Sequence, residues 1–113
     1  MPYIKLSTSV SLDEKLEEAL KSALGKAITD IPGKTESWLM VELEGDRKLW
    51  LGGKKRPLAM IDVKIFGKAE PEDFNAMTGT LCDVCQRVLG IKPDGVYVTY
   101  AEVPNWGWNG ENF

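Results

Sequence analysis

The fold is decided by residues 58–101, whose sequence is LAMIDVKIFGKAEPEDFNAMTGTLCDVCQRVLGIKPDGVYVTYA. Apolar and polar residues alternate along 58–66, which predicts a β-strand with one buried face. Pro71 is a favoured first helical residue, and apolar residues then recur at helical spacing over 74–88. The alternation returns over 96–101 and predicts a second strand. This stretch is therefore expected to form a strand–helix–strand unit.

The first half of the chain follows the same plan. A short strand over 3–7 precedes a capping-box pattern at 11–14, and leucines then repeat every four residues in a helix that ends near Pro32. A second strand is predicted over 38–44. Crossovers between parallel strands are right-handed, so both helices lie on one face of a shared sheet. We therefore predict one α+β domain over 1–113, with two βαβ units forming a four-stranded mixed sheet and two helices on one face.

The other face of this sheet is predicted to mix aromatic, apolar and charged side chains. Such a surface is too apolar for open water, and the sheet would also have unpaired edges. A ring of subunits whose sheets surround a wet interior removes both problems. Residues 48–51 are predicted to form a further short strand. The residues expected on the open face are Tyr3, Lys5, Trp38, Met40, Glu42, Leu58, Met60, Asp62, Lys64, Tyr97 and Thr99.

The composition of the chain excludes several classes of protein. A net charge of −3 argues against a nucleic-acid partner, and no apolar run is long enough to span a bilayer. Residues 1–10 lack a basic region followed by an apolar one, so we expect no secretory signal and a cytoplasmic location, with unconventional secretion left open. Cys82 and Cys85 lie one helical turn apart, and we expect buried thiols because no further metal ligands accompany them.

The candidate base is Pro2. Removal of Met1, which is usual before a small residue, would give Pro2 a free secondary amine. Burial in an apolar pocket lowers the pKa of an amine from about 8 towards neutrality. The chain has no histidine, the usual proton carrier at neutral pH, so this amine would fill that role.

The strand order is expected to bring three groups to one edge of the sheet. Pro2 opens the first strand, and Lys34 precedes the second strand, which is parallel to it. If a pseudo-two-fold axis relates the two halves, the strand over 58–66 is antiparallel to the first and Phe66 ends at the same edge. An amine, a cation and a backbone amide would then meet. Tyr97 begins its strand at the opposite edge, so it could join them only from a neighbouring subunit.

Several short segments carry a family resemblance, in order and at compatible spacing. They are Met1-Pro2, Gly33-Lys34, Gly52-Gly53 with Pro57, Phe66-Gly67-Lys68, Val96-Tyr97-Val98, and Gly107-Trp108-Asn109 near Phe113. Each segment is unspecific alone, but the ordered set spans the whole chain. Through it the chain resembles the macrophage migration inhibitory factor and D-dopachrome tautomerase family of the tautomerase superfamily.

The resemblance implies a homotrimer with active sites between subunits. It also implies keto–enol tautomerase activity, of the phenylpyruvate or dopachrome type, on a small pyruvyl or enol acid; this mechanism needs no metal or organic cofactor. Pro2 matches the general base, Lys34 the cation that holds the substrate carboxylate, and Phe66 the position whose backbone N–H binds the substrate. The other implied site residues are Tyr3 beside the base, Tyr97 from the adjacent subunit, Thr99 at the aromatic end of the pocket, and Trp106, Trp108 and Phe113 in its hydrophobic wall. Asparagine stands at the position of Thr99 in the mammalian cytokine, which weakens the case for hydroxylated aromatic substrates.

Three other functions stay open on the sequence. A hydratase or dehalogenase acting on an unsaturated acid would want a further carboxylate or arginine to activate water, and none is obvious. A cytokine-like signalling or binding protein could carry a vestigial pocket, with a receptor that is unknown. A purely structural trimer is the third. The run Lys54-Lys55-Arg56 is expected to be a solvated turn and is only a weak indication of an anion or proteoglycan contact.

Overall fold

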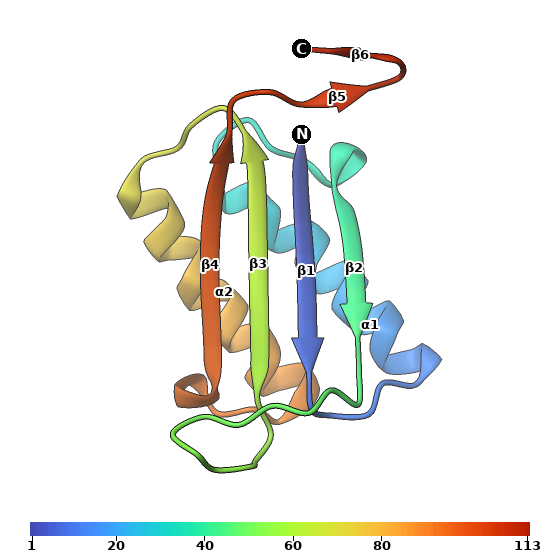
Figure 1. The fold of residues 1–113 in the computed structure, drawn as a ribbon, viewed down its shortest axis with the longest axis vertical. Helices are drawn as coiled ribbons and strands as arrows, with labels where there is room; N and C mark the ends of the chain where they lie inside the picture. The colour runs from blue at the N-terminus through green and yellow to red at the C-terminus, as the bar shows by residue number, and fades with distance from the viewer.

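Two βαβ units build a single sheet in the computed structural model, which describes residues 1–113 (Figure 1). The first unit consists of β1 (Pro2–Thr8), α1 (Glu14–Ala27) and β2 (Met40–Glu44), and the second of β3 (Ala59–Phe66), α2 (Pro71–Leu89) and β4 (Val96–Val103). Short 3-10 helices cover Ile28–Asp30 (η1), Glu36–Trp38 (η2) and Pro93–Gly95 (η3), and a C-terminal hairpin pairs β5 (Gly107–Trp108) with β6 (Glu111–Asn112).

The strands lie in the order β2-β1-β3-β4. The two strands of each unit are parallel, whereas β1 and β3, which join the units, are antiparallel. Both helices lie on the same side of the sheet (Figure 1), so the predicted four-stranded mixed sheet with two helices on one face is confirmed. Pro2 lies opposite Ile65 and Thr8 opposite Ala59. The start of β1 therefore lies beside the end of β3.

The alternation in the strands produces the core between sheet and helices. Every second residue of β1 and β3 is buried, and each helix buries one apolar stripe against them. Removing one such side chain from water contributes about 1.5–3 kcal/mol to folding. The fully buried side chains with the largest volumes are Ile4, Leu6, Leu20, Leu24, Ile28, Ile31, Ile61, Val63, Ile65, Met77, Leu81 and Ile91.

The ends of α2 agree with the sequence prediction. Glu70 and Asp73 form a capping box, in which each side chain accepts a hydrogen bond from the backbone N–H of the other residue. Pro71 is the first residue of the helix. Gly90 ends the helix in the left-handed conformation, with φ of 68°. Neither α2 nor any other helix combines the length and the hydropathy that crossing a lipid bilayer requires.

The capping box predicted at Ser11 is wrong. The Ser11 hydroxyl donates to the Asp46 carboxylate across the neighbouring loop, so it does not cap the helix. Asp13 is the N-cap of α1 instead, and its carboxylate accepts a hydrogen bond of 2.8 Å from the Leu16 N–H. The helix therefore begins later than the pattern suggested, because the serine is held by a tertiary contact.

Two predictions about the open face of the sheet are also wrong. Trp38 does not begin β2, because the Trp38 and Leu39 N–H groups close a 3-10 turn and the strand starts only at Met40. Leu58 precedes β3 and is buried, with 4% of its surface exposed. Its carbonyl accepts bonds from the Thr8 hydroxyl and the Ser9 N–H, which hold it over the end of β1.

The short strand predicted over 48–51 is absent. Leu51 forms only an isolated bridge with Lys54, across a turn made by Gly52 and Gly53. Within one chain this segment pairs with neither edge of the sheet, so β2 and β4 remain its outer strands.

Two glycines with open space around the site of a Cβ atom should respond to alanine in opposite directions. Gly33 has a φ of +81°, where a side chain is strained, so Gly33→Ala should lower the free energy of unfolding by about 1–2 kcal/mol. Gly79 lies within α2 at a negative φ, so Gly79→Ala should raise it by roughly 0.5–1 kcal/mol. Urea unfolding of both variants measures the difference; two shifts of the same sign would contradict this assignment of backbone strain.

Candidate active site

The amino-terminal end of β1 brings together the chain terminus, a lysine and a backbone amide. The Phe66 N–H donates a hydrogen bond of 2.9 Å to the Met1 carbonyl, which extends the β1–β3 ladder by one residue. The Lys34 Nζ donates a bond of 2.8 Å to the Phe66 carbonyl. Groups from three separate parts of the sequence thus lie within one hydrogen-bond network at this end of the sheet.

A tight turn after α1 positions Lys34. Ile31 is buried in the core, and its carbonyl accepts a hydrogen bond of 3.1 Å from the Lys34 N–H. Gly33, between them, adopts the left-handed conformation that closes this turn. The lysine is therefore attached to the core through a short, hydrogen-bonded segment, and its half-buried side chain extends to the end of β3.

The electrostatics of this end favour a neutral amine. Burial, and after it the positive charge of Lys34 and a hydrogen bond with that side chain, lower the pKa of the Met1 α-amino group from its ordinary value of 8.0. The nitrogen of Pro2 lies in the Met1–Pro2 peptide bond, and a tertiary amide is not basic. Residue 2 itself is buried at the start of β1.

The C-terminal hairpin provides an aromatic wall over this end of the sheet. Asn109 and Gly110 both have positive φ, as the two central residues of a tight hairpin turn require, and the hairpin lies beyond the start of β1 (Figure 1). The Phe113 ring lies 5.6 Å from the Phe66 ring, and the Trp108 ring stacks 6.2 Å from Phe113. The Phe113 N–H donates to the carbonyl of Trp106, which holds the end of the chain against the hairpin.

Trp38 also belongs to this wall, although the sequence had suggested a strand position on the open face. The 3-10 turn η2 places its ring against Trp108, edge to face, with 5.2 Å between centroids. The turn over residues 35–39, which follows Lys34 directly, has no distinctive local pattern in the sequence. The segment Thr35-Glu36-Ser37-Trp38 is as compatible with a turn as with a strand.

Tyr97 and Thr99 are not brought to this cluster by their own chain. Tyr97 begins β4 opposite Met60, at the other end of the sheet from Pro2, and 59% of its surface is exposed. The Thr99 hydroxyl donates to Asp62 over a distance of 2.7 Å. Both residues could therefore reach a site at the start of β1 only as part of another copy of the chain.

Tyr3 is adjacent to Pro2 but faces the other side of the sheet. Its hydroxyl donates to the Glu42 carboxylate, and this hydrogen bond is the main reason that the pKa of Tyr3 is raised to about 12. The Lys64 Nζ lies 5.7 Å from the centre of its ring. Tyr3 is therefore a protonated hydrogen-bond donor on the open face and not a base.

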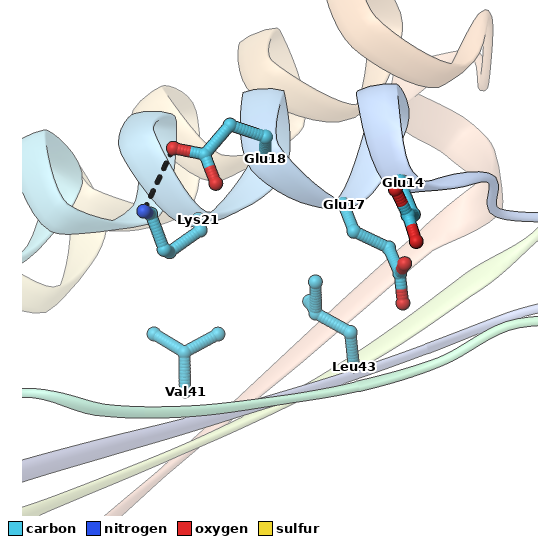
Figure 2. A pocket seen from close by; sticks show the side chains of 6 residues that line it. All are labelled: Glu14, Glu17, Glu18, Lys21, Val41 and Leu43. Carbon is cyan, nitrogen blue, oxygen red and sulfur yellow. Dashed lines mark ion pairs between the residues drawn. The ribbon is translucent and has the colours of Figure 1, made fainter.

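The hollow with the largest volume lies elsewhere, along the groove between α1 and the edge strand β2 (Figure 2). Its volume is about 690 Å³, and its Lys21 is paired with Glu18 at 2.7 Å. Carboxylates on this rim would repel an acidic substrate, and the groove includes none of the residues at the start of β1. Its lining residues are Glu14, Glu17, Glu18, Lys21, Val41 and Leu43.

The two cysteines of α2 offer no reactive thiol. Burial raises the pKa of Cys85 to about 12, and burial also raises the pKa of Cys82. A thiol that stays protonated is a poor nucleophile and a poor metal ligand. The structure contains no group of three or more cysteine, aspartate or glutamate side chains that could hold a metal ion.

Comparisons with known proteins agree with this architecture. The family model described as Macrophage migration inhibitory factor (MIF) matches residues 1–113. The macrophage migration inhibitory factor of Xenopus laevis is 28% identical, and the alignment covers 100% of this chain and 99% of that protein. The crystal structure of MIF2 from Leishmania major superposes with a TM-score of 0.93 at 29% identity, covering 100% of this chain and 97% of that one. The homologue from Prochlorococcus marinus gives a TM-score of 0.82 at 27% identity, with 98% of each chain covered. The resemblance predicted from the sequence is confirmed: the chain belongs to the macrophage migration inhibitory factor family.

Proposed function

We propose that the protein is a keto–enol tautomerase whose general base is the amine of Pro2, exposed by removal of Met1. Family membership supports a tautomerase in general. The observation that carries the finer proposal is the convergence of the chain terminus, Lys34 and the Phe66 amide at one end of the sheet. Loss of Met1 would free the Phe66 N–H, because its present acceptor is the Met1 carbonyl.

The mechanism needs one proton and no other reactant. The neutral Pro2 amine takes a proton from the carbon next to the substrate carbonyl, and the electrons move to the carbonyl oxygen. The conjugate acid then returns the proton to that oxygen, which yields the enol and restores the base. A base with a pKa near the working pH contributes about 10²–10⁴-fold to the rate. Burial and Lys34 lower the pKa of the α-amino group of Met1, and we expect both to lower the pKa of an amine on Pro2 as well.

The substrate class follows from the remaining groups. Lys34 would bind a carboxylate with a charge-assisted hydrogen bond, and the Phe66 N–H would donate to the carbonyl oxygen on which charge develops. The aromatic wall of Phe66, Phe113 and Trp108 suits an apolar, planar substituent. A pyruvyl acid with an aromatic side chain, such as phenylpyruvate, combines all three features.

A homotrimer would complete the site. Exposed apolar side chains at both ends of the sheet, among them Met40 and Tyr97, and the unpaired edges of β2 and β4 favour association with further copies. A hollow at the start of β4 is lined by eight residues, of which seven are apolar, among them Trp50, Leu51 and Tyr97. This lining suits insertion of a side chain from a neighbouring subunit. In such a ring, Tyr97 and Thr99 of one subunit would close the pocket of the next.

Replacement of the base should abolish most turnover while the fold persists. Pro2→Gly leaves a primary amine with altered basicity and geometry, so phenylpyruvate tautomerisation should fall by about 10²-fold or more. The same loss is expected for protein that intact mass shows to retain Met1. Circular dichroism supplies the folding control. Full activity in either form would rule out the Pro2 nitrogen as the base.

Lys34 should act on both binding and the pH profile. Lys34→Ala removes the carboxylate partner, so KM should rise about 10–100-fold. It also removes the positive charge that disfavours a protonated amine, so the pKa of the base should rise. At low pH kcat falls because the base becomes protonated. This fall should then occur at a pH about one unit higher. Lys26→Ala, an exposed lysine of α1, is the matched control; a fall that moves to lower pH would contradict the proposed charge effect.

Co-expression tests whether a site is shared between subunits. Pro2→Gly and Tyr97→Ala should each lose at least about tenfold in kcat/KM alone. Mixed trimers should regain activity, since some sites then combine an intact Pro2 with a neighbour's intact Tyr97. A mixture of Pro2→Gly with Trp108→Ala should show no rescue, because Trp108 and Pro2 belong to the same chain's site. Mass spectrometry confirms mixing, and an unrescued first mixture would exclude Tyr97 from a shared site.

A further inference from the structure

The loop over residues 45–57, here called the basic loop, has a charge opposite to that of the rest of the chain. It contains five of the 14 lysines and arginines but only one of the 17 acidic residues, so its charge is +4 and that of the remaining residues is −7. Two of its cations are paired within the chain, Arg47 with Glu44 and Arg56 with Asp94. The cations with no ion pair are Lys48, Lys54 and Lys55, all exposed.

The conformation of the basic loop is fixed by its own contacts. Leu51 and Lys54 exchange backbone hydrogen bonds of 3.0 and 3.1 Å across two glycines with positive φ. The Lys55 Nζ lies 5.6 Å from the centre of the Trp50 ring, so the two arms of the loop lie side by side. An ordered loop loses less conformational entropy when a ligand binds.

Both ends of the basic loop are attached to the sheet. The Arg47 N–H donates to the Thr8 carbonyl over 2.9 Å, and the Ser9 hydroxyl donates to the Arg56 carbonyl over 3.1 Å. A shallow hollow of about 250 Å³ lies beside this attachment, lined by Ser9, Val10, Lys55, Arg56 and Pro57. The loop lies at the opposite end of the sheet from the chain terminus (Figure 1), so it is separate from Pro2, Lys34 and Phe66 of its own chain.

We propose that the basic loop binds a narrow, linear polyanion of the sulfated-polysaccharide class. Closely spaced sulfate groups match the unpaired lysines Lys48, Lys54 and Lys55 on the two adjacent arms of the loop. The three lysines are not among the residues proposed for the tautomerase site.

A broad anionic partner fits this end of the molecule poorly. Helix α1 begins at the same end of the sheet (Figure 1), and its first turns carry Glu14, Glu17 and Glu18, the acidic residues of Figure 2. A bilayer or a nucleic-acid duplex presents a wide field of negative charge, which these carboxylates would repel over about 8 Å, one screening length. A single polysaccharide chain can follow the loop and avoid them.

Binding of a short heparin oligosaccharide, measured by calorimetry at several NaCl concentrations, tests the proposal. Wild-type protein should bind, with an affinity that falls as salt rises. The triple variant Lys48→Gln, Lys54→Gln, Lys55→Gln should bind roughly 100-fold more weakly, since each close charge pair contributes about fivefold in water. The corresponding triple Lys→Arg variant should keep its affinity, because the charges remain.

A matched control separates the basic loop from net charge. The variant Lys15→Gln, Lys26→Gln, Lys92→Gln removes the same charge from exposed, unpaired lysines elsewhere and should bind heparin as the wild type does. Equal losses in both variants, no binding by the wild type, or tighter binding to phosphatidylserine vesicles or duplex DNA would overturn the proposal. Thermal melting and phenylpyruvate turnover of the loop variant should be unchanged, so a failed tautomerase proposal would leave this result intact.

Discussion

The antiparallel pairing of β1 with β3 is the constraint on which the rest of the structure depends. It joins two units that would each leave a sheet edge and an apolar face uncovered, and it allows both helices to share one core. It also sets the register that puts residue 2 beside residue 65. Without this pairing, the terminus of the chain and the end of β3 would have no reason to be close.

The candidate site depends on this register and needs only two further short structural elements. A four-residue turn from Ile31 to Lys34 supplies the cation, and a two-strand hairpin supplies the wall. Each of these parts is local in sequence, so each could vary without disturbing the core. The one ionisable amine close to Lys34 is the chain terminus, and its lowered pKa comes from burial and from that lysine.

The sequence was sufficient to predict the fold because its periodicities are strong. Alternation in β3 and the apolar stripe of α2 are each visible without the structure, and Pro71 and Gly90 mark the helix termini. The convergence of Pro2, Lys34 and Phe66 followed from strand direction together with an assumed pseudo-two-fold axis between the two halves. The catalytic and binding roles of these three residues remain predictions, which the geometry supports.

What could not be predicted depended on tertiary contacts. Serine is a favoured N-cap residue, but the Ser11 hydroxyl donates a hydrogen bond to the Asp46 carboxylate instead. Trp38 lies in a stretch rich in strand-forming residues, yet hydrogen bonds of the preceding turn place it against Trp108. Both contacts, Ser11 with Asp46 and Trp38 with Trp108, join residues that are far apart along the chain. Local sequence patterns therefore do not predict them.

The position of the C-terminal hairpin over the start of β1 has a practical consequence for anyone who handles the protein. Both ends of the polypeptide meet at the same rim, so an affinity tag or fluorescent fusion at either end would crowd the one region where chemistry is expected. The Gly52-Gly53 turn, at the far end of the molecule, is exposed and has room for added atoms. Reporter peptides and surface-immobilisation handles inserted there would leave the rim free, at the cost of the polyanion-binding surface proposed for the same loop.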